Sequence, residues 1–221
     1  MEPVSVFRLK APSHETRLSS IAGFLIQNPE LARKPKKGDS FGSENYWNEM
    51  VERFVASRLP RSPQEPTTVP DPMVSVILEE YFNVPTGNLE SVAKQHSLAM
   101  AAENIVGDIL ERYIASVLEP HGWVWCSGEV VKKIDFLAPS LSQTGSLVPI
   151  QIKNRDNSEN SSSSSVRDGT QIIKWFRTFS RTGKTNWEAF PELTPKVELS
   201  EEKFRAFARE YLEELSEARK V

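Results

Sequence analysis

Cysteine, histidine and long apolar runs are all scarce in this sequence of 221 residues. The one cysteine, Cys126, excludes an internal disulfide and any cysteine-based zinc cluster. The three histidines are scattered, without the spacing of metal ligands. No run is long and apolar enough to span a bilayer, and the start MEPVSVFRLK lacks the apolar core of a signal peptide. We therefore expect a soluble cytoplasmic protein, with Cys126 as a buried structural thiol.

An excess of positive charge is also absent. The chain has 27 basic and 30 acidic residues, a net charge of −3, which argues against a histone-like nucleic-acid binder but leaves local basic patches open. The glycine-rich phosphate-binding motifs GxGxxG and GxxxxGK are missing. Gly183-Lys184-Thr185 imitates the end of the second motif, but no strand and glycine run precede it. A nucleotide-binding site of these types is therefore excluded.

Helical periodicity dominates the first hundred residues. Apolar residues recur at three- and four-residue spacing in 15–27, 43–59 and 72–82. Between the last two lies RLPRSPQEPTTVPDP, whose five prolines forbid a helix and predict an extended connection. Neither side of this connection has the pattern of a self-sufficient domain. We expect one domain over 1–221, with a mainly helical part (1–96), a core (97–190) and a C-terminal helix (198–221).

The second half of the chain mixes helices and strands. A long amphipathic helix is predicted over 98–118. WVWCSG, EVVKKIDFLAP and LVPIQIK are rich in β-branched and aromatic residues and predict three consecutive strands. Helical periodicity returns in TQIIKWFRTFSR and in 201–220. The expected class is α/β (α+β), with helices flanking a central mixed sheet.

Polar side chains share one face of two of these strands. In a strand, successive side chains point to opposite faces, so Asp135 points away from Ile134 and Phe136. For the same reason Gln151 and Lys153 point away from Ile150 and Ile152. If the strands are neighbours, a carboxylate, an amide oxygen and an ammonium converge on one side of the sheet. Mg²⁺ prefers oxygen ligands, and a lysine can orient or help deprotonate the water that attacks a phosphodiester. The alternative is a solvated cross-strand ion pair between Asp135 and Lys153.

A fourth candidate group lies on the long helix before these strands. Glu103 is aligned with the apolar stripe that contains Val106 and Leu110, so we expect it to be partly buried and to need a partner such as a metal ion. Glu111 falls on a more polar stripe and ranks second. A capping or salt-bridging role for Glu103 is an equally weighted alternative.

These residues resemble the PD-(D/E)XK nuclease core, in the variant where glutamine replaces the second acid. Asp135 matches the first acid, Gln151 the second, Lys153 the lysine and Glu103 the acid of the preceding helix. Ile134 replaces the proline of the motif, a common variation. The resemblance implies a restriction-endonuclease-like fold in which Asp135, Gln151, Glu103 and the carbonyl of Ile152 hold Mg²⁺, with Mn²⁺ as a substitute. Since Gln151 removes a negative charge, we expect weaker metal binding or a single-metal mode.

More narrowly, KNRDNSENSSSSSVRDGTQIIKWF resembles type II restriction endonucleases of the SinI type, over about residues 98–187. This resemblance implies Mg²⁺-dependent cleavage of double-stranded DNA at GG(A/T)CC. Cutting both strands of a symmetric site implies a homodimer. It also implies a cognate DNA methyltransferase as a genetic, not a physical, partner.

The polar stretch after Lys153 has the side chains that read DNA bases. Arginine, asparagine and acidic residues recognise guanine, adenine and cytosine edges, and serines donate to phosphates. The base-reading candidates are Arg155, Asp156, Asn157, Ser161, Ser162, Ser163, Arg167 and Asp168. Phosphate contacts are expected from Lys174, Arg177, Arg181 and Lys184 on the following helix and loop. The alternative for the serine tract is a disordered linker, and for the basic residues a solvated helix face.

Two rival functions remain open at this point. One is a repair or junction nuclease of the same fold with little sequence preference. The other is a catalytically silent DNA-binding module, in which Gln151 marks lost activity.

Overall fold

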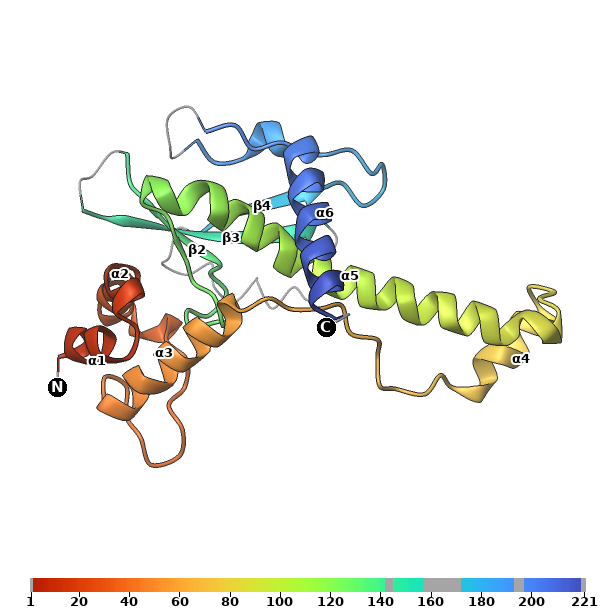
Figure 1. The fold of residues 1–221 in the computed structure, drawn as a ribbon, viewed down its shortest axis with the longest axis horizontal. Coiled ribbons are helices and arrows are strands. Elements are labelled where there is room, and N and C mark those ends of the chain that lie inside the picture. Colours follow the sequence, from red (N-terminus) through yellow and green to blue (C-terminus); the bar gives the residue numbers. More distant parts are fainter. Residues whose placement is uncertain (1, 142–144, 157–171, 193–196, 220–221) are drawn as a thin grey trace. The chain divides into compact units, whose positions relative to one another are not determined.

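The computed structural model of the chain describes residues 2–141, 145–156, 172–192 and 197–219 (Figure 1). Two compact units are present. Met1–Pro60 and Leu110–Val221 together form the main unit, and Arg61–Ile109 form the second. The first boundary coincides with the start of the proline-rich connection. The expectation of a single nuclease domain over 1–221 stays a prediction.

Three helices open the main unit: α1 (Pro3–Lys10), α2 (Glu15–Gln27) and α3 (Glu44–Arg58). The short 3-10 helices Pro12–His14 and Pro29–Leu31 flank α2. The hydroxyl of Ser43 caps α3 by accepting a 3.2 Å hydrogen bond from the backbone N–H of Tyr46. The predicted α2 and α3 are confirmed to within a residue at each end. The eight-residue α1 was not predicted, because two turns are too short to show a period.

The core of the main unit joins these helices to the segment 124–137. Buried residues of α1, α2 and α3 pack with Val124, Cys126, Val130, Ile134 and Leu137. Cys126 is a free, buried thiol, as expected, and burial raises its pKa well above the usual value. The first helices and the residues around the start of the second strand therefore share one hydrophobic core.

Four strands form one mixed sheet in the order β1-β2-β3-β4. They are β1 (Val124–Trp125), β2 (Phe136–Pro139), β3 (Leu147–Arg155) and β4 (Ile173–Thr178). The pairs β1–β2 and β2–β3 are antiparallel, whereas β3 and β4 are parallel. The predicted α+β class with a mixed sheet flanked by helices is confirmed (Figure 1).

Two secondary-structure predictions are wrong. Residues 170–181 were expected to be helical, but 173–178 form β4. Ile173, Trp175 and Phe176 suit a pleated strand as well as a helix, and pairing with β3 decides between the two. The second error is that WVWCSG and EVVKKIDFLAP are strands only at 124–125 and 136–139, because the chain between them turns. Glu129 and Lys133 there have positive φ angles of 52° and 62°.

Two long helices are also present in the described residues. α5 (Leu89–Leu118) begins nine residues before the predicted start, and α6 (Glu201–Ala218) matches its prediction closely. Phe204 of α6 is buried, and its ring lies near Tyr113 of α5 and Trp187. In the part of the chain that the structure describes, no helix has the length and apolar character needed to cross a bilayer.

The Arg61–Ile109 unit has very little core of its own. It contains the extended proline-rich segment, α4 (Pro72–Glu80), the 3-10 helix Thr86–Asn88 and the first part of α5. Its buried residues are Ala101, Ile105 and Ile109. Two ion pairs, Lys94–Glu65 at 2.7 Å and Arg61–Asp108 at 3.8 Å, connect the extended segment to α5.

Candidate active site

The carboxylate of Asp135 is fixed across two strands of the sheet. Its backbone N–H donates to the carbonyl of Ile150 at 2.9 Å, and its carbonyl accepts from the N–H of Cys126 at 2.8 Å. The side chain then turns to β3, where Oδ2 accepts a 2.6 Å hydrogen bond from the N–H of Ile152. Asp135 is therefore held in place by main-chain bonds on both sides and by its own carboxylate.

Burial gives this carboxylate an unusual proton affinity. Desolvation raises the pKa of Asp135 from 3.8 to about 6, although the N–H of Ile152 and the charge of Lys153 both lower it. A nearby cation stabilises the ionised form of a buried carboxyl group. A divalent ion would therefore offset the free-energy cost of ionising this group away from water. The carboxylate of Asp135 is therefore a group whose ionised form a bound cation would stabilise.

Gln151 and Lys153 extend from β3 on the same face as Asp135. Continuing the pairing of Phe136 with Ile150 by one residue places Asp135 opposite Gln151. Gln151 is buried and Lys153 is exposed, while Ile150 and Ile152 point to the other face and are buried there. The structure thus brings together the three residues that the sequence placed on one face.

The donor set fits a hard cation with few protein ligands. A carboxylate, an amide oxygen and the carbonyl of Ile152 are oxygen donors of the kind that Mg²⁺ accepts while keeping several waters. Among the described residues, no group of three or more histidine, cysteine or acidic side chains is placed to hold a metal ion.

The two helix glutamates differ in environment. Glu103 belongs to the Arg61–Ile109 unit and is exposed, so the expectation that it is partly buried is wrong. Glu111 is half-buried, and its Oε2 accepts a 2.8 Å hydrogen bond from the indole Nε1 of Trp125. Trp125 pairs with Phe136, on the face opposite to Gln151 and Lys153. Glu111 therefore approaches the sheet from the other side.

The candidates for DNA contacts begin at the end of β3, next to Lys153. Arg155 and Asp156 are both exposed. The N–H of Asp156 donates to the carbonyl of Thr178 at 3.2 Å, and its Oδ1 accepts from the N–H of Ser180 at 2.8 Å. Six other candidates lie outside the described residues: Asn157, Ser161, Ser162, Ser163, Arg167 and Asp168.

The predicted phosphate contacts lie on a strand and a turn instead of a helix. Lys174 is the β4 neighbour of Gln151, and Arg181 and Lys184 are exposed in the turn after β4. Arg177 is engaged inside the protein: its guanidinium makes a 2.7 Å ion pair with Glu201 of α6, and both side chains are largely shielded from solvent. Arg177 thus joins β4 to α6 in this structure.

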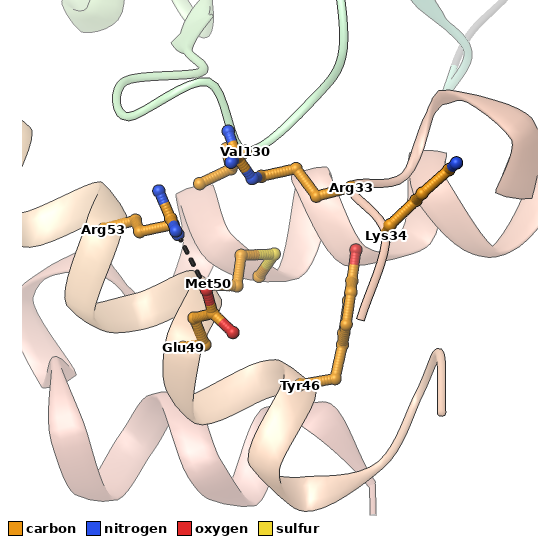
Figure 2. Close-up of a pocket in the computed structure, with 7 residues that line it drawn as sticks. All are labelled: Arg33, Lys34, Tyr46, Glu49, Met50, Arg53 and Val130. Carbon is orange, nitrogen blue, oxygen red and sulfur yellow. Dashed lines mark hydrogen bonds and ion pairs between the residues drawn. The ribbon is translucent and has the colours of Figure 1, made fainter. Parts of the chain in front are cut away.

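A basic cluster near the start of β2 was missed by the sequence interpretation. Arg33 pairs with Glu129 at 3.0 Å, and the N–H of Lys132 donates to the carbonyl of Leu31 at 2.8 Å. Arg33, Lys34 and Arg53 line a cavity of about 20 Å³ with Tyr46, Glu49, Met50 and Val130 (Figure 2). Glu49 accepts from Arg53 at 2.9 Å within it. No local signal predicts this cluster, because Leu31, Ala32 and Arg33 make their contacts with residues 129–132, which are remote in sequence.

Comparison with known proteins identifies the family. A model of the SinI restriction endonuclease family matches residues 9–214. The chain is 48% identical to the type II restriction enzyme Eco47I of Escherichia coli over 204 residues, which cover 91% of this chain and 88% of that protein. It is 44% identical to the type II restriction enzyme SinI of Salmonella infantis over 207 residues, 92% of this chain and 90% of that protein. The chain belongs to the SinI restriction endonuclease family.

Proposed function

We propose that this chain is a type II restriction endonuclease that cleaves double-stranded DNA at GG(A/T)CC with Mg²⁺. The observation that supports this most strongly is the carboxylate of Asp135, fixed on the N–H of Ile152 between Gln151 and Lys153. This arrangement suits phosphodiester hydrolysis, because it puts an acidic metal ligand and a cation on one face of the two inner strands of the sheet. The two relatives, both named type II restriction enzymes, support the reaction class.

Each residue of the site has a distinct role in this proposal. Asp135, Gln151 and the carbonyl of Ile152 hold the ion in this proposal. Bound Mg²⁺ supplies positive charge that stabilises the transition state at phosphorus, and Mn²⁺ can replace it. Lys153 orients the attacking water and offsets negative charge on the phosphate. Because the pKa of Asp135 is raised to about 6, protons compete with the ion for this carboxylate at and below that pH.

DNA recognition follows from what surrounds the site. Arg155 and Asp156 leave β3 two and three residues after Lys153 and face solvent, where they can reach base edges. Arg181, Lys184 and Lys174 contact phosphates on one side. Further phosphate contacts come from the basic cluster of Arg33, Lys34, Arg53 and Lys132, the last of which lies three residues before Asp135 in the sequence.

The biological setting completes the proposal. One chain has one such site, so cutting both strands requires a homodimer whose symmetry matches that of the target. The enzyme acts in the cytoplasm, where its DNA substrates are. A methyltransferase of the same specificity protects host DNA without a lasting contact.

Digestion of phage DNA tests the proposal directly. The expected result is discrete fragments whose ends map to GG(A/T)CC, with no cleavage after Mg²⁺ is chelated. A smear of fragments would support a nuclease with little sequence preference. Intact DNA with Mg²⁺ or Mn²⁺, together with tight DNA binding, would support a silent binding module. Discrete fragments with other ends would overturn only the proposed sequence.

A further inference from the structure

The helix α4 is too exposed to be stable by itself. None of its nine residues is buried, although Pro72–Leu78 contains no charged side chain. Isolated helices shorter than about 12–15 residues are marginal in water, and helices in proteins are stabilised chiefly by packing of an apolar face. The unit that contains α4 has only three buried residues among those described. This helix therefore needs a surface that covers it.

The apolar residues of α4 and the two that follow it form what we call the α4 surface. It consists of Met73, Val74, Val76, Ile77, Tyr81 and Phe82, which are between 44% and 77% exposed. At roughly 150–250 Å² for a fully exposed large side chain, these fractions leave on the order of 650 Å² open. A standard protein interface covers about 800 Å² per partner and is enriched in methionine and aromatic residues. The α4 surface has the size and composition of an interface.

Charge excludes DNA as the occupant of this surface. Arg61–Ile109 contain seven acidic and two basic residues, and both basic residues are in ion pairs with acidic ones. The rest of the chain therefore has 25 basic and 23 acidic residues. A surface that neutralises phosphates needs the opposite balance. The partner of the α4 surface is a protein.

The chain itself offers one matching apolar surface, which is the α4 surface of another copy. In the described part of the main unit, large exposed apolar side chains are scattered singly over different elements: Leu9, Ile26, Leu59, Leu141, Phe179 and Leu212. A two-fold interface uses the same patch on both subunits and so requires a self-complementary surface, as an apolar helix face is.

We propose that the α4 surface is the dimer interface of this enzyme, with α4 packing on α4 of a second copy about a two-fold axis. This inference rests on the proposed function for its need of two active sites, but the interface can be tested without DNA. Because both partners are acidic here, salt should strengthen the dimer by screening their repulsion, whereas salt weakens DNA binding.

Sedimentation velocity of the full chain over a range of concentrations tests the interface. Wild type should be dimeric at micromolar concentration, and Ile77→Glu should raise the dissociation constant at least 10-fold, since glutamate keeps helix propensity but buries a charge. Ile26→Glu is the matched control, because Ile26 is 56% exposed in α2 and Ile77 is 51% exposed in α4. A second variant, Tyr81→Ser with Phe82→Ser, removes apolar area without touching α4 and should also weaken the dimer.

The outcomes separate the interface from the enzymatic activity. The inference is overturned if wild type is monomeric at concentrations where it cleaves DNA, or if the α4 variants dimerise as wild type does. It is equally overturned if Ile77→Glu lowers the melting temperature of a monomeric protein, since α4 would then pack within its own chain. A dimer that α4 variants weaken, in a protein that cuts no DNA, would support the interface and refute the proposed function.

Discussion

The N–H of Ile152 donates a 2.6 Å hydrogen bond to the carboxylate of Asp135, which lies one strand away. Because Ile152 stands between Gln151 and Lys153, this bond aligns the proposed metal ligand with both of its neighbours on β3. It also leaves Oδ1 of the same carboxylate without a bond to the main chain of Ile152. One backbone amide thus sets the geometry of the whole candidate site.

Replacing Lys153 by alanine should abolish cleavage and leave specific DNA binding within a small factor. The ammonium acts on the transition state, and losing such a group typically costs roughly 10²–10⁴-fold in rate. Single-turnover cleavage and a binding titration in Ca²⁺ measure the two effects. Lys10→Ala, on the exposed side of α1, is the control. Normal cleavage by Lys153→Ala would remove this residue from the catalytic machinery.

Asp135→Asn should stabilise the metal-free protein at neutral pH. The folded-state pKa of about 6 lies above the ordinary 3.8, so the stability that protonated Asp135 contributes is full below pH 3.8 and is lost as pH rises through about 6. Asparagine can still accept from Ile152 and avoids this loss, which is about 3 kcal/mol for a pKa raised from 3.8 to about 6. Chemical denaturation at pH 4 and 7.5 in chelator is the measurement.

Mg²⁺ should reverse that ranking, because it binds the carboxylate of wild type and not the amide of Asp135→Asn. Asp39→Asn, outside the site, should respond to neither pH nor Mg²⁺ in this way. Equal stabilisation of both proteins by Mg²⁺ would show that Asp135 is not a ligand.

Substitutions at Gln151 should change the Mg²⁺ concentration needed for half-maximal cleavage. Gln151→Glu is near-isosteric and adds a charge, so it should lower that concentration; its rate need not rise, because the added charge also faces the phosphate. Gln151→Ala loses a ligand and should raise the Mg²⁺ concentration needed for half-maximal cleavage. Cleavage rate against Mg²⁺ concentration gives all three curves. A shared midpoint would mean that Gln151 does not contact the ion.

Arg155→Ala should reduce sequence discrimination, whereas Arg181→Ala should not. A lost contact to a guanine edge costs about 1–3 kcal/mol on the cognate site only, and a lost phosphate contact weakens all sequences alike and lowers the salt dependence. Binding of cognate and random duplexes at several salt concentrations compares the two variants. If Arg155→Ala weakens both duplexes equally, this residue contacts the backbone.

Local alternation was enough to predict which side chains of the candidate site share one face of the sheet. Gln151 and Lys153 share a face because the period of a strand is two, whatever the rest of the fold does. Glu103 was different: an apolar stripe predicts that a helix face is covered, but only the tertiary structure decides which part, and Glu103 is exposed. The run Ile172–Phe176 fits a helix or a strand, and parallel pairing with β3 is a long-range event without a local signal.

Ion pairs between segments that are distant in the sequence could not be predicted either. Arg177 looked like one of several basic residues beside DNA, and its partner Glu201 is 24 residues away. Arg33 and Glu129 are 96 residues apart, so the basic run in the first part of the chain gave no hint that it meets the segment leading to Asp135. The positions of Arg33 and Glu129 follow from the shared core of α1, α2, α3 and 124–137.

The buried thiol of Cys126 makes this chain convenient for site-specific labelling. Thiol reagents attack the thiolate, and Cys126 is 3% exposed with a strongly raised pKa, so it should stay unmodified in the native state. A cysteine introduced at an exposed position away from α4, such as Ser216 of α6, would then be the one reactive thiol in the molecule. Fluorophores attached there in two separately labelled batches would report subunit exchange in real time, without removal of the native residue.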